Sequence, residues 1–332
     1  MAPRFSIIVL FDRDQPEPCL ASLLAQTGPA FEIIAVVNPG VTLPSHPNLR
    51  HLEEADRNPA RRRNRAAALA QGDILAFLDD DAAAPTDWLA KADRLWQAQP
   101  ELAGLGGPNL APSQGSGREW LSDVILTTPY LGSGNPTYLS RGSPRPALPG
   151  DLHLCNFFAR RDCFQQLGGF NEALGYGAED SEFIYLGRRR HGYRFDFFPE
   201  LWVTHRRRPF GPAYLCQRFR LRRQNGRLLW VYPDMYAKNP SLRAALLLVP
   251  LFLISVWLKP VLVLGWALVY LAAVWTLAWK RAAERPWSLP LIPLAFLLHH
   301  LIYALGLGCG WLEGLLQGPG RLRRRLGRPG HS

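Results

Sequence analysis

Residues 72–81, GDILAFLDDD, decide the fold, because an apolar run leads directly into three acids. The run 74–78 has the length and composition of a buried strand, and Gly72 closes the helix-forming segment PARRRNRAAALAQG before it. Upstream, strand, helix and strand are predicted for FSIIVLF (5–11), CLASLLAQT (19–27) and FEIIAVV (31–37). This alternation predicts an α/β fold, a mostly parallel sheet with helices on its faces.

The three acids after the last of these strands form the first candidate site. In parallel sheets, ligands bind beyond the carboxyl ends of the strands, which is where Asp79, Asp80 and Asp81 lie. Carboxylates there suit a hard divalent cation that bridges them to a substrate diphosphate. Acids at strand ends also cap helices and form turns, so this reading stays open beside the metal site.

A second constellation is GGFNEALGYGAEDSEFIYLGRRRHGY, residues 168–193. The pattern predicts a glycine turn and then an amphipathic helix that begins at Glu179 and Asp180 and ends at Gly192. Acids in a first helical turn also complement the helix dipole, which is a purely structural alternative.

Composition narrows the class of protein. The chain has 332 residues, 48% of them apolar or aromatic, and its five cysteines are scattered without a CxxC pair, which argues against a disulfide scaffold or a zinc ribbon. A net charge of +11 favours anionic partners: nucleic acid, nucleotide phosphates or an acidic membrane. The first apolar run is too short for a signal peptide, so we expect the front of the protein in the cytosol.

Three apolar runs, 242–257, 260–279 and 286–316, predict an integral membrane protein. Basic clusters follow the second and the third run, and the positive-inside rule places both clusters in the cytosol. Three full spans cannot satisfy this, so either one run is interfacial or re-entrant, or the rule is violated at the tail. Within the third run, glycines at 306, 310 and 314 line one helix face and predict close packing against another helix.

Residues 5–192 carry, in this order, FSIIV, CLASLLAQT, FEIIAVV, the Arg63–Asn64 pair, GDILAFLDDD, GGFNE and AED. This ordered set resembles the family-2 glycosyltransferases of the GT-A fold. The segments GLGGPNLAP, PYLGSGNPTY and HHLIYALGLGCGWLEGLL are similar to the membrane-anchored members that build exopolysaccharide or cell-surface glycans, such as succinoglycan-type glucosyltransferases.

The resemblance implies an inverting hexosyltransferase that moves a sugar from a nucleotide-diphosphate donor to an acceptor hydroxyl. Asp79 and Asp81 match the D-x-D motif, which implies that Asp79 faces the donor and that Asp81 holds Mn²⁺ or Mg²⁺ against the diphosphate. Asp180 matches the general base, and Glu179 would orient that base or the acceptor.

Other matched positions imply donor contacts. Asp80, Arg63 and His205 are expected near the donor, although an isolated histidine is more often a packing or capping residue. Where the family carries two acids after the second strand, this chain has Val37 and Asn38; Asn38 can still hydrogen-bond a base or ribose. The acids of the first loop, Asp12 and Asp14, are expected to do part of that work.

These patterns predict a GT-A domain over 1–209, a basic amphipathic membrane-interface segment over 210–241, a transmembrane region over 242–316 with two or three spans, and a basic cytoplasmic tail over 317–332. The expected partners are a nucleotide-diphosphate sugar, a lipid-linked or other glycan acceptor, and anionic lipids, at the cytosolic face of the inner membrane. One alternative is a non-catalytic assembly partner of a glycan machine. A nucleic-acid-binding membrane protein is disfavoured, because no binding module is recognisable.

Overall fold

The computed structural model describes residues 2–12, 18–129, 131–132, 136–140, 142–236, 251, 254–259, 261–288 and 290–328. Asp14 and most of the apolar run 242–257 lie outside these residues. The chain forms two compact units. The first unit comprises Met1–Ser113 and Pro136–Arg206, and the second comprises Gln114–Asn135 and Arg207–Ser332.

The first unit is built on an eight-stranded sheet with the order β3–β2–β1–β4–β9–β6–β10–β8. The three predicted strands form its parallel centre: β1 (Phe5–Phe11) pairs with both β2 (Phe31–Val37) and β4 (Ile74–Asp79). Strand β3 (Leu49–Glu53), which was not predicted, extends the parallel edge beyond β2. Strands β1, β2 and β4 are buried on both faces, which is why their sequences are short apolar runs. The carboxyl ends of β1, β2 and β4 therefore meet at one edge of the sheet.

The other half of the sheet was not predicted from the sequence. It contains β6 (Leu102–Gly106), β8 (Arg145–Pro146), β9 (Phe157–Arg160) and β10 (Arg194–Phe197). Strand β9 runs antiparallel between β4 and β6, so the sheet is mixed but mostly parallel. A second, three-stranded sheet joins β5 (Ala82–Ala83), β11 (Val203–His205) and β7 (Asn109–Leu110).

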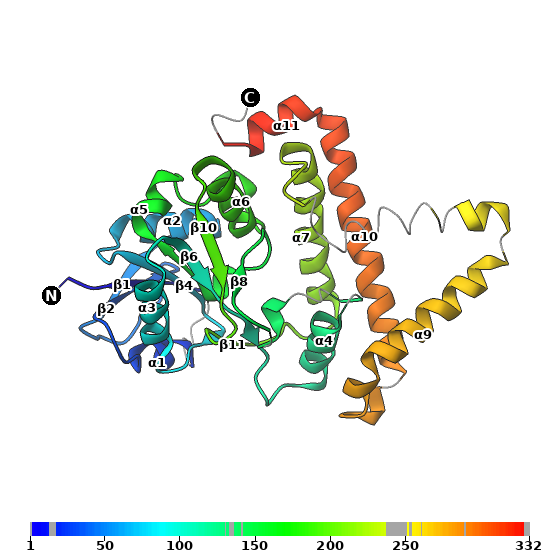
Figure 1. Cartoon of the computed structure of the whole chain (residues 1–332), viewed down its shortest axis with the longest axis horizontal. Coiled ribbons are helices and arrows are strands. Elements are labelled where there is room, and N and C mark those ends of the chain that lie inside the picture. Colours follow the sequence, from blue (N-terminus) through cyan, green and yellow to red (C-terminus); the bar gives the residue numbers. More distant parts are fainter. Residues whose placement is uncertain are drawn as a thin grey trace. The chain divides into compact units, whose positions relative to one another are not determined.

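Helices cover both faces of the large sheet (Figure 1). On one face, α1 (Cys19–Leu24) and α3 (Trp88–Ala98) pack on the alternate residues Phe5, Ile7 and Val9 of β1. On the other lie α2 (Pro59–Leu69), α5 (Arg161–Gln166) and α6 (Glu179–His191). A cluster of phenylalanines fills the space under α5 and α6: Phe77, Phe157, Phe164, Phe170, Phe183 and Phe195. The α/β fold class predicted from the sequence is confirmed.

The second unit is helical and contains α4 (Gly117–Thr127), α7 (Pro212–Val231), α9 (Leu262–Ala282), α10 (Leu291–Gln317) and α11 (Pro319–Leu326). Among the described residues, two helices are long and apolar enough to cross a membrane, Leu262–Arg281 and Leu291–Gln317. Short 3-10 turns complete the two units: η1 (Pro136–Tyr138), η2 (Leu154–Asn156), η3 (Glu172–Leu174) and η4 (Pro286–Ser288).

Helix α4 belongs to the second unit, although its sequence position is inside the range 1–209. Its apolar side chains, Val124 and Ile125 among them, pack on α9 and α10. Asp123 adds a polar tie, because it accepts hydrogen bonds from Arg207 (Nε, 2.9 Å) and from Arg281 on α9 (Nη2, 3.0 Å). The sequence of α4 does not show that its partners are α9 and α10, which lie more than a hundred residues further along the chain.

Candidate active site

The end of β4 brings two acids and a histidine together. After Asp79 the chain continues into β5, which pairs antiparallel with β11 and aligns Ala82 with His205. The His205 Nε2 atom therefore lies 3.1 Å from Asp81 Oδ1 and 3.6 Å from Asp79 Oδ2. Three residues that were predicted to lie near the metal or the diphosphate therefore converge. His205 lies more than a hundred positions after the two acids, so no local sequence pattern shows that it meets them.

The charges at this point are strongly coupled. Burial by itself lowers the pKa of His205, but the hydrogen bonds and negative charges of Asp79 and Asp81 outweigh it and raise that pKa to about 9. Burial raises the pKa of Asp79, and the hydrogen bond to His205 together with the charge of Arg63 reverses this, so that its pKa lies below the usual value. The imidazolium acts as a cation between the two carboxylates.

The donor set fits a divalent metal. Carboxylate oxygens and an imidazole nitrogen are ligands of Mn²⁺ and Mg²⁺, and the convergence of two acids on His205 provides the negative potential that such an ion needs. Asp79, His205 and Cys155 also offer ligand atoms that all lie within 4.8 Å of one another. Cys155 is a buried residue of η2. The sequence shows it only as one of five scattered cysteines, because no local pattern connects it to Asp79.

Arg63 connects the two candidate constellations. It lies on α2, a helix that begins well because the Asn58 side chain accepts from the Ala60 and Arg61 backbone N–H groups, with Pro59 at the first helical position. The buried Arg63 guanidinium donates to Asp79 Oδ1 (3.0 Å) and to Glu179 Oε1 (3.4 Å). Arg63, which stays a predicted donor contact, ties the end of β4 to the start of α6.

Glu179 and Asp180 begin α6, as predicted. The preceding Ala178 has φ +71°, a left-handed conformation that costs a non-glycine residue about 1 kcal/mol, and such strain concentrates at functional sites. Burial and the neighbouring charge of Asp180 raise the pKa of Glu179 to about 7, although Arg63 opposes the shift. Within the described part of the chain, Glu179 Oε2 is buried and has no hydrogen-bond partner. Asp180 Oδ1 accepts from the Ser181 backbone N–H (2.6 Å).

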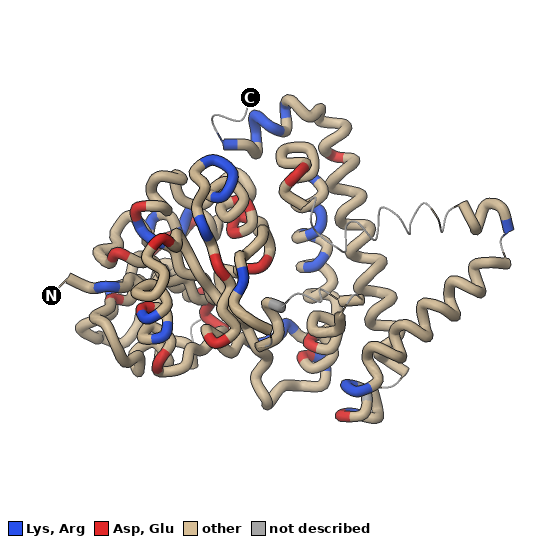
Figure 2. Tube along the Cα trace, in the orientation of Figure 1, with Lys and Arg blue, Asp and Glu red and all other residues tan. Residues whose placement is uncertain are grey.

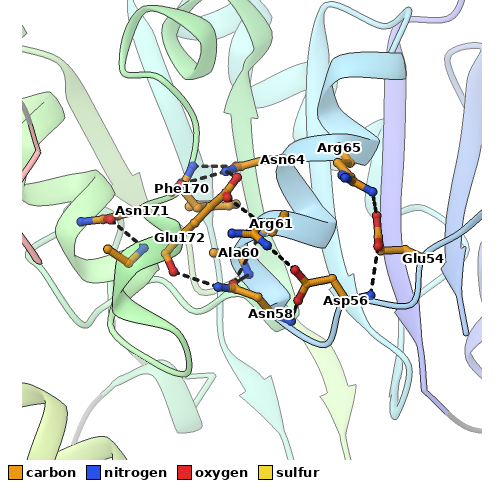
Figure 3. A network of polar contacts seen from close by, with 11 residues as sticks. Glu54, Asp56, Asn58, Ala60, Arg61, Asn64, Arg65, Phe170, Asn171 and Glu172 are labelled. Carbon is orange, nitrogen blue, oxygen red and sulfur yellow. Dashed lines mark hydrogen bonds and ion pairs between the residues drawn. The ribbon is translucent and has the colours of Figure 1, made fainter. Parts of the chain in front are cut away.

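A network of polar contacts fixes the loop that leads to these acids (Figure 3). Asn64 on α2 donates to Phe170 O (2.8 Å) and accepts from Phe170 N (2.8 Å), so it pairs with the loop like a neighbouring strand. Glu172 accepts from Arg61 (Nε, 2.8 Å) and from Asn64 (Nδ2, 3.0 Å). A Cβ at Gly169, which has φ +70°, would lie 2.6 Å from Asn64 Oδ1. The Arg63–Asn64 pair and the GGFNE motif therefore meet in space.

The remaining predicted donor residues lie along the same sheet edge. Asp12 follows β1 and its backbone N–H donates to Asp80 Oδ2 (3.3 Å), while Asn38 directly follows β2 and is half-buried. Sequence reasoning missed Arg62, which is 1% exposed, pairs with Asp12 and donates to Val36 O (3.0 Å). Arg62 and Arg63 are both buried whereas the Arg61 side chain is 43% exposed, and three consecutive arginines give no sequence signal for which of them turn inward.

Comparisons with known proteins agree with this geometry. Residues 7–164 match the model of the Glycosyl transferase family 2. The succinoglycan biosynthesis protein ExoM of Rhizobium meliloti (strain 1021) is 33% identical over 166 residues, which are 48% of this chain and 48% of that protein, so the chain spans about half the length of this curated relative.

A solved structure extends the likeness to the fold. The mannosyltransferase PcManGT from Pyrobaculum calidifontis, in complex with GDP-Man and Mn²⁺, superposes with a TM-score of 0.52 and 21% identity, over 95% of this chain and 88% of that one. At that identity the likeness concerns the fold. The strand order, the motif order and the match over residues 7–164 together support a glycosyltransferase family 2 domain, and the superposition shows the same fold.

Proposed function

We propose that the chain transfers a sugar, with inversion at its anomeric carbon, from a nucleotide-diphosphate donor to a hydroxyl of a lipid-linked or other glycan acceptor. We place this reaction at the cytosolic face of the inner membrane, in cell-surface or exopolysaccharide synthesis. The observation that supports it best is Arg63, whose guanidinium contacts both Asp79 and Glu179. It holds the acids proposed for donor and acceptor chemistry beside each other.

In the proposed reaction, the acceptor oxygen attacks the anomeric carbon, and the bond from that carbon to the diphosphate breaks with its electron pair on the leaving diphosphate. The carboxylate of Asp180 takes the acceptor proton. Burial raises the pKa of Glu179 to about 7, and the protonated form of this carboxyl can donate a hydrogen bond that orients the acceptor or the base. Arg63 fixes the position of Glu179 relative to Asp79.

Asp79, Asp81 and His205 would hold the metal ion, Mn²⁺ or Mg²⁺. The bound ion offsets the negative charge that develops on the leaving diphosphate. Asp12, Asn38 and Asp80 lie at the adjoining strand ends, and together with Arg62 of α2 they are proposed to contact the nucleoside. The +11 net charge favours attraction of an anionic donor.

The first test is donor binding by calorimetry on the full chain in lipid nanodiscs, with UDP-, GDP- and dTDP-sugars, each with and without Mn²⁺. We expect metal-dependent binding of one nucleotide class, and its loss in Asp81→Asn. No binding of any donor by folded protein would contradict the transferase and favour the non-catalytic assembly partner.

A second test isolates the base. Asp180→Asn keeps the shape of the side chain but removes the proton acceptor, so transfer should fall by about 10²–10⁴-fold while donor binding is retained. Asp162→Asn is the matched control, because Asp162 is an exposed acid on α5 paired with Arg160. Full transfer by Asp180→Asn would remove Asp180 from the role of base.

A further inference from the structure

Helix α7 packs along α10 in a way that decides which apolar helix can cross a bilayer. The two helices lie side by side (Figure 1) and run parallel. Near one end, the Tyr214 hydroxyl and His299 Nδ1 are 3.0 Å apart, and near the other, Trp230 Nε1 donates to Trp311 O (2.9 Å). The contact therefore extends over most of the length of α10.

The contact is backbone against backbone. A Cβ at Gly306 would lie 2.6 Å from Phe219 O, and one at Gly310 would lie 1.9 Å from Arg223 O. From the other side, a Cβ at Gly226 would lie 2.3 Å from Leu307 O. The predicted glycine stripe of α10 thus has α7 as its partner, at a distance that leaves no room for lipid between the two helices.

Helix α7 is strongly basic along this contact (Figure 2). Its cations are Arg218, Arg220, Arg222, Arg223 and Arg227, and the helix has no acid. Arg223 and Arg227 donate to Glu313 Oε1 and Oε2 (2.6 Å each), and the Arg222 guanidinium lies 4.1 Å from the centre of the Tyr303 ring. These contacts bind α10 to the arginine-bearing helix.

This packing makes α10 a costly transmembrane span. From His299 to Gly314 the contact covers about 22 Å at 1.5 Å per residue, most of a hydrocarbon core of about 30 Å. A perpendicular α10 would carry the arginines of α7 into that core. An arginine near the centre of the core is unfavourable to insert, and Glu313 offsets the charge of only one of them.

The face of α10 turned away from α7 is apolar and exposed. Its leucines recur at seven- and four-residue intervals: Leu294, Leu301, Leu305, Leu312 and Leu316. A leucine face beside an arginine helix is the composition of an element that lies at the headgroup boundary, with the apolar side in the acyl region and the guanidinium groups at the lipid phosphates.

We infer that α10 lies in the plane of an anionic bilayer, with α7 beside it, and does not cross it. Because α7 and α10 then lie on the same side, the chain between them crosses an even number of times, and α9 together with the apolar run predicted at 242–257 supplies the two crossings. The second basic cluster fits this arrangement, because α11 folds back on α7: Arg323 Nε donates to Trp230 O (3.0 Å), and Leu322 and Leu326 are buried. The basic residues at the end of α9 and those of α11 then lie on the same side, as the positive-inside rule requires.

The first test measures sidedness on the full chain. Ala283→Cys after α9 and Arg325→Cys on α11 are each exposed, and the background replaces the exposed Cys216 and Cys309 by serine. A membrane-impermeant maleimide is applied to inside-out and right-side-out vesicles. We expect both cysteines to react in inside-out vesicles only. Reaction of the two cysteines from opposite sides would overturn the inference, because α10 would then cross.

The second test measures depth. Spin labels at Leu294, Leu301, Leu305 and Leu312 in nanodiscs that contain phosphatidylglycerol should all be shallow and at similar depths. Labels at Leu264, Leu268 and Leu271 of α9, which are exposed, serve as the spanning control and should differ in depth. A depth profile in α10 that is deepest near Leu301 and Leu305 and shallow at both ends would refute the in-plane placement. Neither test reads activity, so failure here leaves the proposed function standing.

Discussion

Two helices of this chain, α2 in the first unit and α7 in the second, carry runs of arginines that are used differently. Arg62 and Arg63 are less than a tenth exposed and contact carboxylates from separate elements, Asp12, Asp79 and Glu179. On α7, Arg223 and Arg227 share one acid, Glu313, and Arg223 is 41% exposed. The position of the acids, and not the density of arginines, separates a helix that assembles a site from a helix that binds a neighbouring helix.

The largest expected effect tests this contrast directly. Arg63→Ala leaves Glu179 buried without its cation and takes one of two cationic partners from the half-buried Asp79, which typically costs about 3–5 kcal/mol of folding free energy and should also weaken metal-dependent donor binding. Arg223→Ala, by contrast, removes one of two partners of a half-exposed pair, so we expect a cost of at most about 1 kcal/mol.

The measurement is the thermal midpoint in detergent together with donor affinity. Arg63→Lys separates charge from geometry, because a lysine keeps the cation but not the fork that contacts two acids. Equal costs for Arg63→Ala and Arg223→Ala would break the comparison between α2 and α7.

Glu179 offers a pH test of the buried site. A carboxyl whose pKa rises from 4.5 to about 7 on folding binds its proton more tightly in the folded state. Its stabilising contribution is complete below pH 4.5 and is lost as the pH rises toward 7, by about 3 kcal/mol at most. Glu179→Gln cannot ionise, so the variant should gain stability relative to the wild type between pH 5 and pH 7.5, with the metal chelated. An identical pH dependence in both proteins would show that Glu179 titrates as an exposed acid.

Much of the first unit could be predicted from the sequence because its signals are local. A run of residues and the glycine or acids that end it predict each of four elements: β1, β2, β4 and the helix that begins at Glu179. Strand β9 and the contribution of Cys155 could not be predicted, because each depends on a partner far along the chain. The roles of the site residues and the boundaries at 209, 241 and 316 stay predictions.

In the second unit, hydropathy predicted the apolar helices but not their neighbours. A window that counts leucines in α10 gives the same value whether α7 packs on the helix or lipid surrounds it. The glycine stripe was the signal for a packing partner, but it did not identify that partner as the arginine-bearing α7. The arginines of α7 therefore decide whether α10 can cross the bilayer, a question that the composition of α10 alone leaves open.

Gly310 and Gly308 sharpen the helical side of the comparison. Gly310→Ala would place a Cβ 1.9 Å from Arg223 O, whereas a Cβ at Gly308 meets nothing within 4 Å. We expect Gly310→Ala to lower stability by about 1–3 kcal/mol through overpacking. Gly308→Ala should be neutral or slightly stabilising, because alanine favours helix. Thermal unfolding of the two variants in nanodiscs measures the difference, and two equal midpoints would mean that α7 does not lie against Gly310 in the membrane.

The smallest expected effect concerns two cysteines, one from each unit. Cys155 lies with Asp79 and His205, and a thiolate, an imidazole and a carboxylate together suit Zn²⁺ better than Mn²⁺ or Mg²⁺. Zn²⁺ should therefore compete with the metal that supports donor binding, and Co²⁺ should give a thiolate charge-transfer band.

Cys155→Ser should lose the band and weaken Zn²⁺ competition about tenfold, or about 1.4 kcal/mol, while Mn²⁺-dependent donor binding persists. Cys309→Ser is the matched control, because Cys309 is an exposed thiol on α10. If the Co²⁺ band survives in Cys155→Ser, the thiol does not belong to the metal site, and the acids and the histidine at the end of β4 bind the ion without it.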